Sequence, residues 1–256
     1  MEDIKVSIIT VCFNSEKTIE RTIKSVLEQT YKNVEYIIVD GASTDATLEI
    51  VDRYREDFGE KLKVVSEKDD GIYFAMNKGI DLSIGTLIGI INSDDWYEAD
   101  AVQKIVDAYE ADHDNPLTVY YGNTGMIKSD NLISISESDH NKLEDDMISH
   151  PSCFITKKAY EDMGAYNTDY TSVADYDLML RYKRSGKVDF VHVNEHIANF
   201  TLGGMSSTGK AYIDLLRLKM NYKKLSHVRG NIEIYKARLA MYMEGHGMKQ
   251  IKIRKG

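Results

Sequence analysis

The stretch Leu87-Ile88-Gly89-Ile90-Ile91-Asn92-Ser93-Asp94-Asp95-Trp96-Tyr97 decides the fold class. Its first five residues form a short apolar run, which is typical of a strand buried on both faces of a sheet. The run ends in two adjacent carboxylates, Asp94 and Asp95. Open α/β sheets bind ligands at the carboxyl ends of their strands. A divalent cation that also binds a diphosphate would relieve the repulsion between the two carboxylates, and a turn with two solvated aspartates is the alternative.

Three similar apolar runs precede this stretch and alternate with segments of helical periodicity. The predicted strands are residues 6–11, 36–39, 62–65 and 87–91, and helices are predicted around 19–27, 48–54, 73–82 and 99–111. Strands that are apolar on both faces and alternate with helices indicate a parallel sheet covered by helices. The sequence therefore predicts an α/β protein with a Rossmann-like, mostly parallel central sheet and flanking helices.

The alternation of predicted strands and helices ends near residue 115. Shorter strands follow at 119–122, 126–128 and 188–193, a helix is expected at 174–184, and the polar segment 134–146 is predicted to be a mobile loop. No linker separates the two parts, so we expect one domain over residues 1–209. Its nucleotide-binding half would be 1–115 and its acceptor half 116–209. Residues 210–256 are expected to form a basic, mostly helical extension.

Composition excludes several classes of protein. The chain has only two cysteines, without a CxxC motif or a His/Cys cluster, which argues against a disulfide scaffold and against structural zinc. The N-terminal residues do not resemble a signal segment, and no apolar run approaches the roughly 20 residues that cross a bilayer. We therefore expect a cytoplasmic protein.

Charge is distributed unevenly along the chain. The net charge is −9, yet residues 210–256 hold 12 Lys/Arg against 3 Asp/Glu, so the first 209 residues carry −18. An acidic body of this kind is repelled by nucleic-acid phosphates, so no nucleic-acid partner is expected. The basic C-terminal region is either a solvated helical face or a peripheral contact with the inner face of the cell membrane.

Polar groups follow each of the four predicted strands. They lie at Thr10–Asn14, Asp40–Ser43, Asp69–Gly71 and Asp94–Asp95. Parallel strands bring these groups to one edge of the sheet, and neither a P-loop nor a GxGxxG motif is present to hold phosphates. A nucleotide would therefore be held by carboxylates together with a cation. Asp40 could accept a hydrogen bond from a base N–H, or it could instead close an Asx-turn.

In this order, the motifs resemble those of the family 2 glycosyltransferases. The resemblance runs through roughly the first 200 residues and is most specific in the first 100. The matching segments are Val6–Asn14, Ser25–Thr30, Tyr36–Asp45, Asp70–Tyr73, Ala75–Gly79 and Asn92–Asp95.

The resemblance implies a GT-A fold, a nucleotide-diphosphate-sugar donor, most simply a UDP-sugar, and an inverting transfer that depends on Mn²⁺ or Mg²⁺. The implied partner is a glycan or lipid-linked acceptor in surface polysaccharide synthesis, and an oligomer stays open. Asp94 and Asp95 match the region that touches ribose and metal, although Asn92 stands where many relatives have another aspartate. The donor and nucleotide contacts that the resemblance implies are Thr10, Asn14, Asp40, Asp70, Asn77 and Asp94.

The segment Val173–Arg181 resembles the catalytic segment of the same family. Asp175 matches the base that takes a proton from the acceptor hydroxyl, and the glutamate often found before it is Ala174 here. Without the resemblance, the favoured interpretation of Asp175 is an aspartate that stabilises a helix N-terminus. Asp177 and Arg181 lie four residues apart and are expected to pair on one helix face.

Two aromatic residues near these motifs have open roles. Trp96 either stacks against an acceptor sugar or packs as a core aromatic. His150 either lines the acceptor or sugar pocket or lies in a surface turn. The replacements at Asn92 and Ala174 keep one alternative function open, namely a nucleotide-sugar or glycan-binding module with impaired catalysis.

Overall fold

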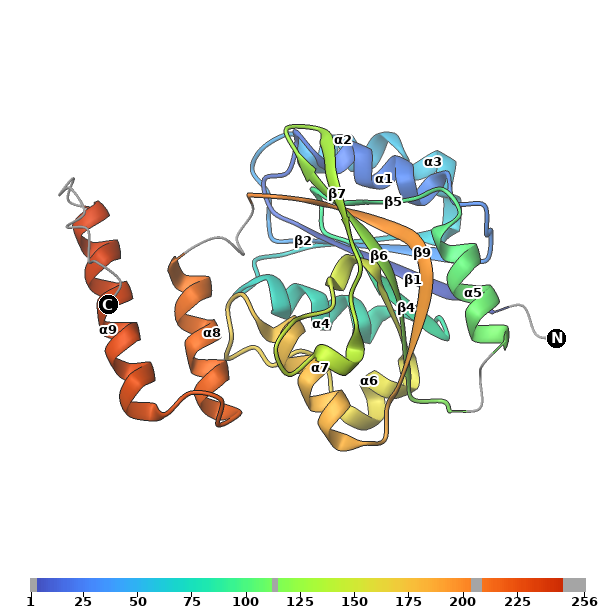
Figure 1. Ribbon diagram of the computed structural model, residues 1–256. Coiled ribbons are helices and arrows are strands. Elements are labelled where there is room, and N and C mark those ends of the chain that lie inside the picture. The colour runs from blue at the N-terminus through green and yellow to red at the C-terminus, as the bar shows by residue number, and fades with distance from the viewer. Residues whose placement is uncertain (1–3, 112–114, 204–208, 246–256) are drawn as a thin grey trace. The chain divides into compact units, whose positions relative to one another are not determined.

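The computed structural model describes residues 4–111, 115–203 and 209–245 (Figure 1). The strands are β1 Val6–Cys12, β2 Val34–Asp40, β3 Leu62–Ser66, β4 Leu87–Ile90, β5 Trp96–Tyr97, β6 Thr118–Lys128, β7 Asn131–Ser136, β8 Cys153–Thr156 and β9 Asp189–Thr201. The α-helices are α1 Ile19–Leu27, α2 Thr47–Arg53, α3 Arg55–Phe58, α4 Ile72–Leu82, α5 Ala101–Ala111, α6 Lys157–Met163, α7 Ala174–Ser185, α8 Gly209–Asn221 and α9 His227–Gly245. Short 3₁₀ helices are found at Gly59–Lys61, His140–Lys142 and His150–Ser152.

One mixed sheet organises most of the chain. Its strand order is β3-β2-β1-β4-β8-β6-β9-β5, and β7 pairs with β6 outside this path. The four strands that the sequence predicts most clearly, β1 to β4, are parallel to one another. The later strands bring in antiparallel pairs, such as β4 with β8 and β6 with β8. The predicted α/β class with a mostly parallel core is confirmed.

The parallel strands are buried because their side chains are apolar on both faces. All seven residues of β1 are buried, and six of the seven residues of β2 are. The register pairs Cys12 with Asp40 and Asp40 with Ser66. The carboxyl ends of β1, β2 and β3 therefore lie level at one edge of the sheet, which brings together the loops that follow them.

The second part of the sheet differs from the prediction. Residues 119–122 and 126–128 were expected as two short strands, but β6 runs through both without a break. Gly122 was expected to end a strand. It instead permits β9 to approach closely, because a Cβ at this position would collide with Ile197. The expected loop 134–146 contains the end of β7 and a 3₁₀ helix at His140–Lys142.

The chain divides into two units. The first comprises Met1–Thr168 and Asp175–Leu202, and the second comprises Asp169–Ala174 and Gly203–Gly256. The first unit contains the whole sheet, with β6, β8 and β9 continuing the strands of the N-terminal part. The proposed split at residue 115 into a nucleotide half and an acceptor half stays a prediction.

In the second unit, residues 209–221 and 227–245 are helical, and residues 246–256 of the predicted extension lie outside the described residues. Within it, Asp214 on α8 accepts hydrogen bonds from the backbone N–H and the hydroxyl of Thr171, at 2.8 and 2.7 Å. In the residues that the structure describes, no helix is both long enough and apolar enough to span a bilayer.

Candidate active site

The carboxylate of Asp40 is buried at the end of β2. Its Oδ1 accepts hydrogen bonds from the Ser43 hydroxyl and, at 3.6 Å, from the Cys12 thiol. Its Oδ2 accepts hydrogen bonds from the Ser43 backbone N–H at 3.0 Å and the Ser66 hydroxyl at 2.7 Å. Both oxygens are thus occupied by the protein, and the side chain is 0% exposed. In this structure Asp40 links the ends of three strands, and the expected hydrogen bond from a nucleobase to Asp40 stays a prediction.

Thr10 and Asn14 also serve the local structure. Thr10 is fully buried on β1 and accepts a hydrogen bond from the Tyr36 hydroxyl at 3.0 Å, and its expected place in a base pocket stays a prediction. Asn14 has a positive φ of 48° and accepts a hydrogen bond from the backbone N–H of Thr44 at 2.8 Å. The two residues shape the loops at this edge, and Asn14 is the one of the two that is exposed.

The adjacent carboxylates Asp94 and Asp95 differ in their surroundings. Asp95 is 0% exposed, and its Oδ1 accepts a hydrogen bond from the Thr201 backbone N–H at 2.8 Å. Its Oδ2 is buried without a partner among the described residues. Burial and the neighbouring charge of Asp94 raise the pKa of Asp95 well above its usual range. Asp95 therefore anchors β9 to the end of β4.

Asp94 is the more accessible of the pair, being half-buried. Burial raises the pKa of the Asp94 carboxyl, and the positive charge of Arg21 and the charged form of His150 oppose this shift. The backbone carbonyl of Asp94 accepts hydrogen bonds from the Thr201 hydroxyl at 2.6 Å and from Arg21 at 3.2 Å. These bonds fix the backbone, and the Asp94 carboxylate lies within electrostatic reach of His150.

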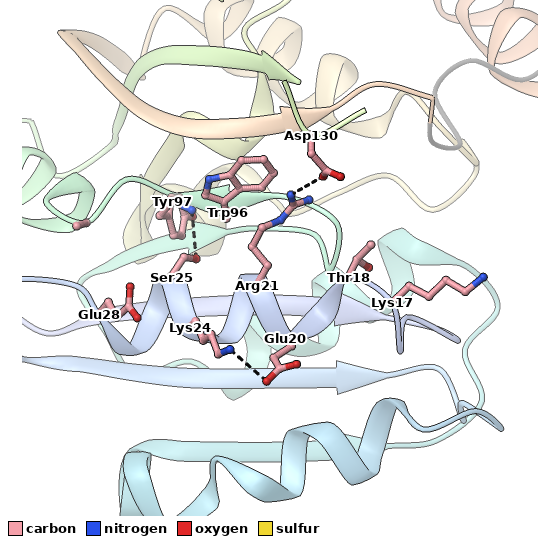
Figure 2. Close-up of a pocket in the computed structure, with 11 residues that line it drawn as sticks. Lys17, Thr18, Glu20, Arg21, Lys24, Ser25, Glu28, Trp96, Tyr97 and Asp130 are labelled. Carbon is pink, nitrogen blue, oxygen red and sulfur yellow. Dashed lines mark hydrogen bonds and ion pairs between the residues drawn. The ribbon is translucent and has the colours of Figure 1, made fainter. Parts of the chain in front are cut away.

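Trp96 is covered by a cation rather than presented to a sugar. The guanidinium of Arg21 lies 3.6 Å from the centroid of the Trp96 ring and also pairs with Asp130 at 3.1 Å (Figure 2). These residues line a groove of about 620 Å³ between α1 and the β4–α5 segment. Apart from Trp96, no residue predicted for the site lines this groove. The expected stacking of Trp96 on an acceptor sugar is therefore not supported on the ring face that Arg21 occupies.

Asp175 lies at the start of α7 with its two oxygens in different environments. Oδ1 accepts hydrogen bonds from the Tyr73 hydroxyl at 3.1 Å and from the backbone N–H of Tyr176 at 3.0 Å. Oδ2 lies 3.9 Å from Nδ1 of His150. The side chain is 15% exposed, so the carboxylate is held in place and still reachable. Two residues further on, Asp177 pairs with Arg181 at 2.8 Å, as the spacing predicts.

His150 interacts with two carboxylates from different parts of the sequence, Asp175 and Asp94. Burial lowers the pKa of His150, and the charges of Asp175 and Asp94 oppose this shift. Its Nε2 is buried and has no hydrogen-bond partner among the described residues. The structure thus brings His150 next to Asp175 and within the electrostatic reach of Asp94, as a neutral imidazole at neutral pH.

Asn77 is connected to Asp175 indirectly, through Tyr166 and Tyr73. Its amide donates to the Tyr166 carbonyl at 2.9 Å and accepts from the Tyr166 N–H at 3.0 Å. Tyr166 in turn stacks on Tyr73, with ring centroids 5.5 Å apart and planes at 27°. The amide of Asn77 is therefore bonded to the protein on both sides, and the expected contact with the donor stays a prediction.

Tyr73 and Tyr166 were missed by the sequence reasoning. The only signal was that Tyr73 closes the Asp70–Tyr73 motif, and nothing local links either tyrosine to Asp175, 102 residues away from Tyr73 in the chain. Asp70 itself is exposed just before α4, next to Gly71, while Asp69 beside it is paired with Lys78 at 2.5 Å. Asp70 thus remains accessible to a ligand.

The oxygen atoms in the segment that follows β4 determine whether a divalent cation fits there. Among the described residues, no group of three or more His, Cys, Asp or Glu side chains is arranged to hold a metal ion. However, Asn92 Oδ1 and Asp95 Oδ2 are buried oxygens without a partner in the described part of the chain, and both are near the Asp94 carboxylate in sequence. Oxygen atoms are the ligands that Mg²⁺ and Mn²⁺ prefer. The donor set fits such an ion if a ligand supplies further oxygens.

Comparisons with known proteins identify the family of this chain. The family model "Glycosyl transferase family 2" matches residues 7–164. A PGL/p-HBAD biosynthesis glycosyltransferase from Mycobacterium bovis is 30% identical over 205 residues, which cover 79% of each chain.

Two solved structures share the fold at low sequence identity. Residues 1–349 of Staphylococcus aureus TarS, in complex with UDP-GlcNAc, match with a TM-score of 0.69 at 19% identity, covering 84% of this chain and 65% of that one. The mannosyltransferase PcManGT from Pyrobaculum calidifontis, in complex with GDP-Man and Mn²⁺, matches with a TM-score of 0.65 at 16% identity, covering 98% and 76%. The chain belongs to glycosyl transferase family 2 and is a glycosyltransferase with the GT-A fold.

Proposed function

We propose that this enzyme moves a sugar from a UDP-sugar to a hydroxyl of a glycan or lipid-linked acceptor, with inversion at the anomeric carbon and Asp175 as the base. One observation carries the proposal. Oδ1 of Asp175 is held by Tyr73 and by the backbone of Tyr176, while Oδ2 is directed at His150 in a partly exposed position. A base for an inverting transfer needs this combination of fixed orientation and access.

Asp175, His150 and Asp70 then have separate roles in the proposed reaction. Asp175 takes the proton from the acceptor hydroxyl through Oδ2, because Oδ1 already accepts two hydrogen bonds. His150 is neutral and buried, so its Nε2 is suited to a single hydrogen bond with a hydroxyl or phosphate oxygen of the donor. Asp70, which is exposed at the start of α4, is a further donor contact.

A Mn²⁺ or Mg²⁺ ion is proposed as cofactor, held by Asp94 together with the oxygens of Asn92 or Asp95 and the phosphates of the donor. Such an ion neutralises the charge that builds on a departing nucleoside diphosphate. The partnerless oxygens of Asn92 and Asp95 support this proposal. The complex of PcManGT with both GDP-Man and Mn²⁺ supports it as well.

The choice of UDP over GDP rests on the TarS complex with UDP-GlcNAc, which has the higher TM-score, and PcManGT with GDP-Man makes GDP the competing nucleotide. The acceptor class rests on the family resemblance and on the biosynthetic name of the mycobacterial relative.

The reaction is proposed for the cytoplasmic face of the membrane, as part of surface polysaccharide synthesis. The buried thiols of Cys12 and Cys153 suit a reducing compartment.

The alternative, a binding module with impaired catalysis, is favoured by Ala174 and Asn92, which replace acidic residues of the family pattern. Two measurements on the purified chain separate the proposals. Thermal shift with Mn²⁺ and a panel of nucleotide-sugars should show stabilisation by UDP-sugars above GDP-sugars. Metal-dependent release of UDP from the stabilising donor then identifies an enzyme. Stabilisation with no release, with and without glycan acceptors, would identify the binding module.

A further inference from the structure

Helix α9, His227–Gly245, has two apolar faces on opposite sides. One face contacts α8. Gly230 approaches Met220 of α8 so closely that a Cβ at this position would collide with the Met220 side chain, and Met241 of α9 lies in the same way against Gly209. Ile234 and Ala237 share the spacing of Gly230 and Met241 along the helix and are half-buried.

The opposite face is exposed. Four large side chains are spaced by four, three and four residues, which places them in one stripe along the helix. Their exposed fractions are 74% for Val228, 49% for Ile232, 69% for Tyr235 and 46% for Leu239. We call these four residues the α9 stripe. Since α8 packs on the other side of α9, it does not cover the stripe. Contiguous exposed apolar surface of this kind marks an interaction site.

Cations line both edges of the α9 stripe. Arg229 and Lys236 each follow a stripe residue by one position and so lie along one edge, while Arg238 precedes Leu239 and lies along the other. All three are exposed, and Lys236 also forms a surface ion pair with Glu233 at 2.9 Å. Surface pairs of this kind are weak, so Lys236 is available to a stronger anionic partner.

The charge of the chain around the α9 stripe indicates which kind of partner the stripe binds. Residues 209–245 hold eight Lys/Arg against three Asp/Glu, whereas the first 209 residues carry −18. A second copy paired through the same stripe would bring its own cations against Arg229, Lys236 and Arg238, whereas anionic phospholipid offers apolar chains below a layer of negative charge. An apolar stripe with basic residues on its edges is the arrangement that binds in the plane of such an interface.

We propose that the α9 stripe docks this glycosyltransferase onto an anionic phospholipid surface, with Val228, Ile232, Tyr235 and Leu239 in the acyl boundary and Arg229, Lys236 and Arg238 at the headgroups. This goes beyond the transfer reaction, and it rests on the proposed function only for the lipid-linked acceptor that the enzyme would meet there. The docking itself needs neither donor nor metal.

The test is flotation of the full chain with vesicles of phosphatidylcholine alone or mixed with equal phosphatidylglycerol, without donor. The wild type should float with the anionic vesicles, and high salt should weaken binding. The double variant Ile232→Ser/Leu239→Ser should lose on the order of tenfold in vesicle affinity. The matched control Leu132→Ser/Ile133→Ser removes side chains of similar exposure, 53% and 55%, from β7 and should bind as the wild type does.

A second variant, Arg229→Gln/Arg238→Gln, should lose the preference for anionic vesicles while its thermal unfolding is unchanged. The proposal is overturned if the wild type does not float, if it floats equally with neutral vesicles, or if the stripe variant floats as well as the wild type. A dimer in solution that Ile232→Ser/Leu239→Ser dissociates would assign the stripe to a second copy and also overturn it. UDP-sugar binding in thermal shift, measured without vesicles, reports on the proposed transferase function separately.

Discussion

Nδ1 of His150 lies 3.9 Å from Oδ2 of Asp175, on the oxygen that Tyr73 does not bind. The two oxygens of this carboxylate therefore have different neighbours. One is fixed by two hydrogen bonds, and the other faces a buried, neutral imidazole whose Nε2 has no partner among the described residues. This separation of holding and reacting atoms is the basis of the mechanism proposed for the enzyme.

Replacing His150 with Gln should lower kcat by about 10- to 100-fold, because Asp175 would lose its neighbouring imidazole and the donor its proposed hydrogen bond from Nε2. Since burial lowers the pKa of His150, the neutral form already dominates at neutral pH, so the loss should be as large at pH 7 as at pH 8. The measurement is the rate of UDP release at several pH values.

The control for this variant is His192→Gln, because His192 hydrogen-bonds Asn123 at 3.0 Å and has no contact with Asp175 among those that the structure gives. Its rate should match that of the wild type. Equal losses in the two histidine variants would show that the effect is structural and not specific to His150.

Replacing Asn77 with Ala should destabilise the fold by about 2–4 kcal/mol, because the N–H and carbonyl of Tyr166 would lose their partners. The stacked pair Tyr166–Tyr73 would then hold Asp175 less firmly, so kcat should fall while the Kd for UDP stays unchanged. Asn115→Ala is a suitable comparison, because Asn115 makes a similar set of bonds to residues 117, 187 and 189. It should lower Tm without lowering kcat. An increased Kd for UDP in Asn77→Ala would instead support the direct donor contact expected from the sequence.

Replacing Asp95 with Asn should raise Tm at neutral pH in metal-free buffer. Burial and the charge of Asp94 raise the pKa of Asp95, so the folded state holds this proton more tightly than the unfolded chain does. Stability from this group is therefore present at low pH and is lost as the pH rises from the ordinary pKa of aspartate through the raised one. The charged form thus costs stability at neutral pH, by about 1 kcal/mol or more, and Asn removes this cost.

The gain should shrink below the ordinary pKa of aspartate, where Asp95 is protonated in both states. Asp57→Asn, at an exposed position on α3, should change Tm little at any pH. A Tm of Asp95→Asn below that of the wild type at neutral pH would instead show that the bond from Thr201 needs the full carboxylate charge.

The sequence predicted the parallel part of the fold well because β1, β2 and β4 are buried on both faces, and burial of that kind appears directly as apolar runs. It failed at Gly122, where a glycine inside β6 looks like a strand end but serves the close approach of Ile197 on β9. The approach of two strands separated by about 70 residues leaves no local trace in the sequence.

At the site, too, the sequence does not reveal contacts between residues that are distant in the chain. Motif positions identify which carboxylates and amides lie near the sheet edge, but they do not reveal which of them the protein itself uses. Asp40 and Asn77 both form hydrogen bonds within the protein. Asp40 bonds to Ser43 and Ser66, and Asn77 bonds to Tyr166. Asp175 and His150 are brought together only by the fold, and their chemistry depends on that contact.

The central claim is that Asp175 is the base and does not hold the donor. The most direct measurement pairs the rate of metal-dependent UDP release with the Kd for the donor in Asp175→Asn, against Asp177→Asn on the same helix as the control. Asp175→Asn should lower kcat by about 10²- to 10⁴-fold and leave the donor Kd unchanged. Asp177→Asn should mainly lower Tm, because Asp177 pairs with Arg181. A donor Kd raised tenfold or more in Asp175→Asn, or a kcat close to that of the wild type, would contradict the assignment.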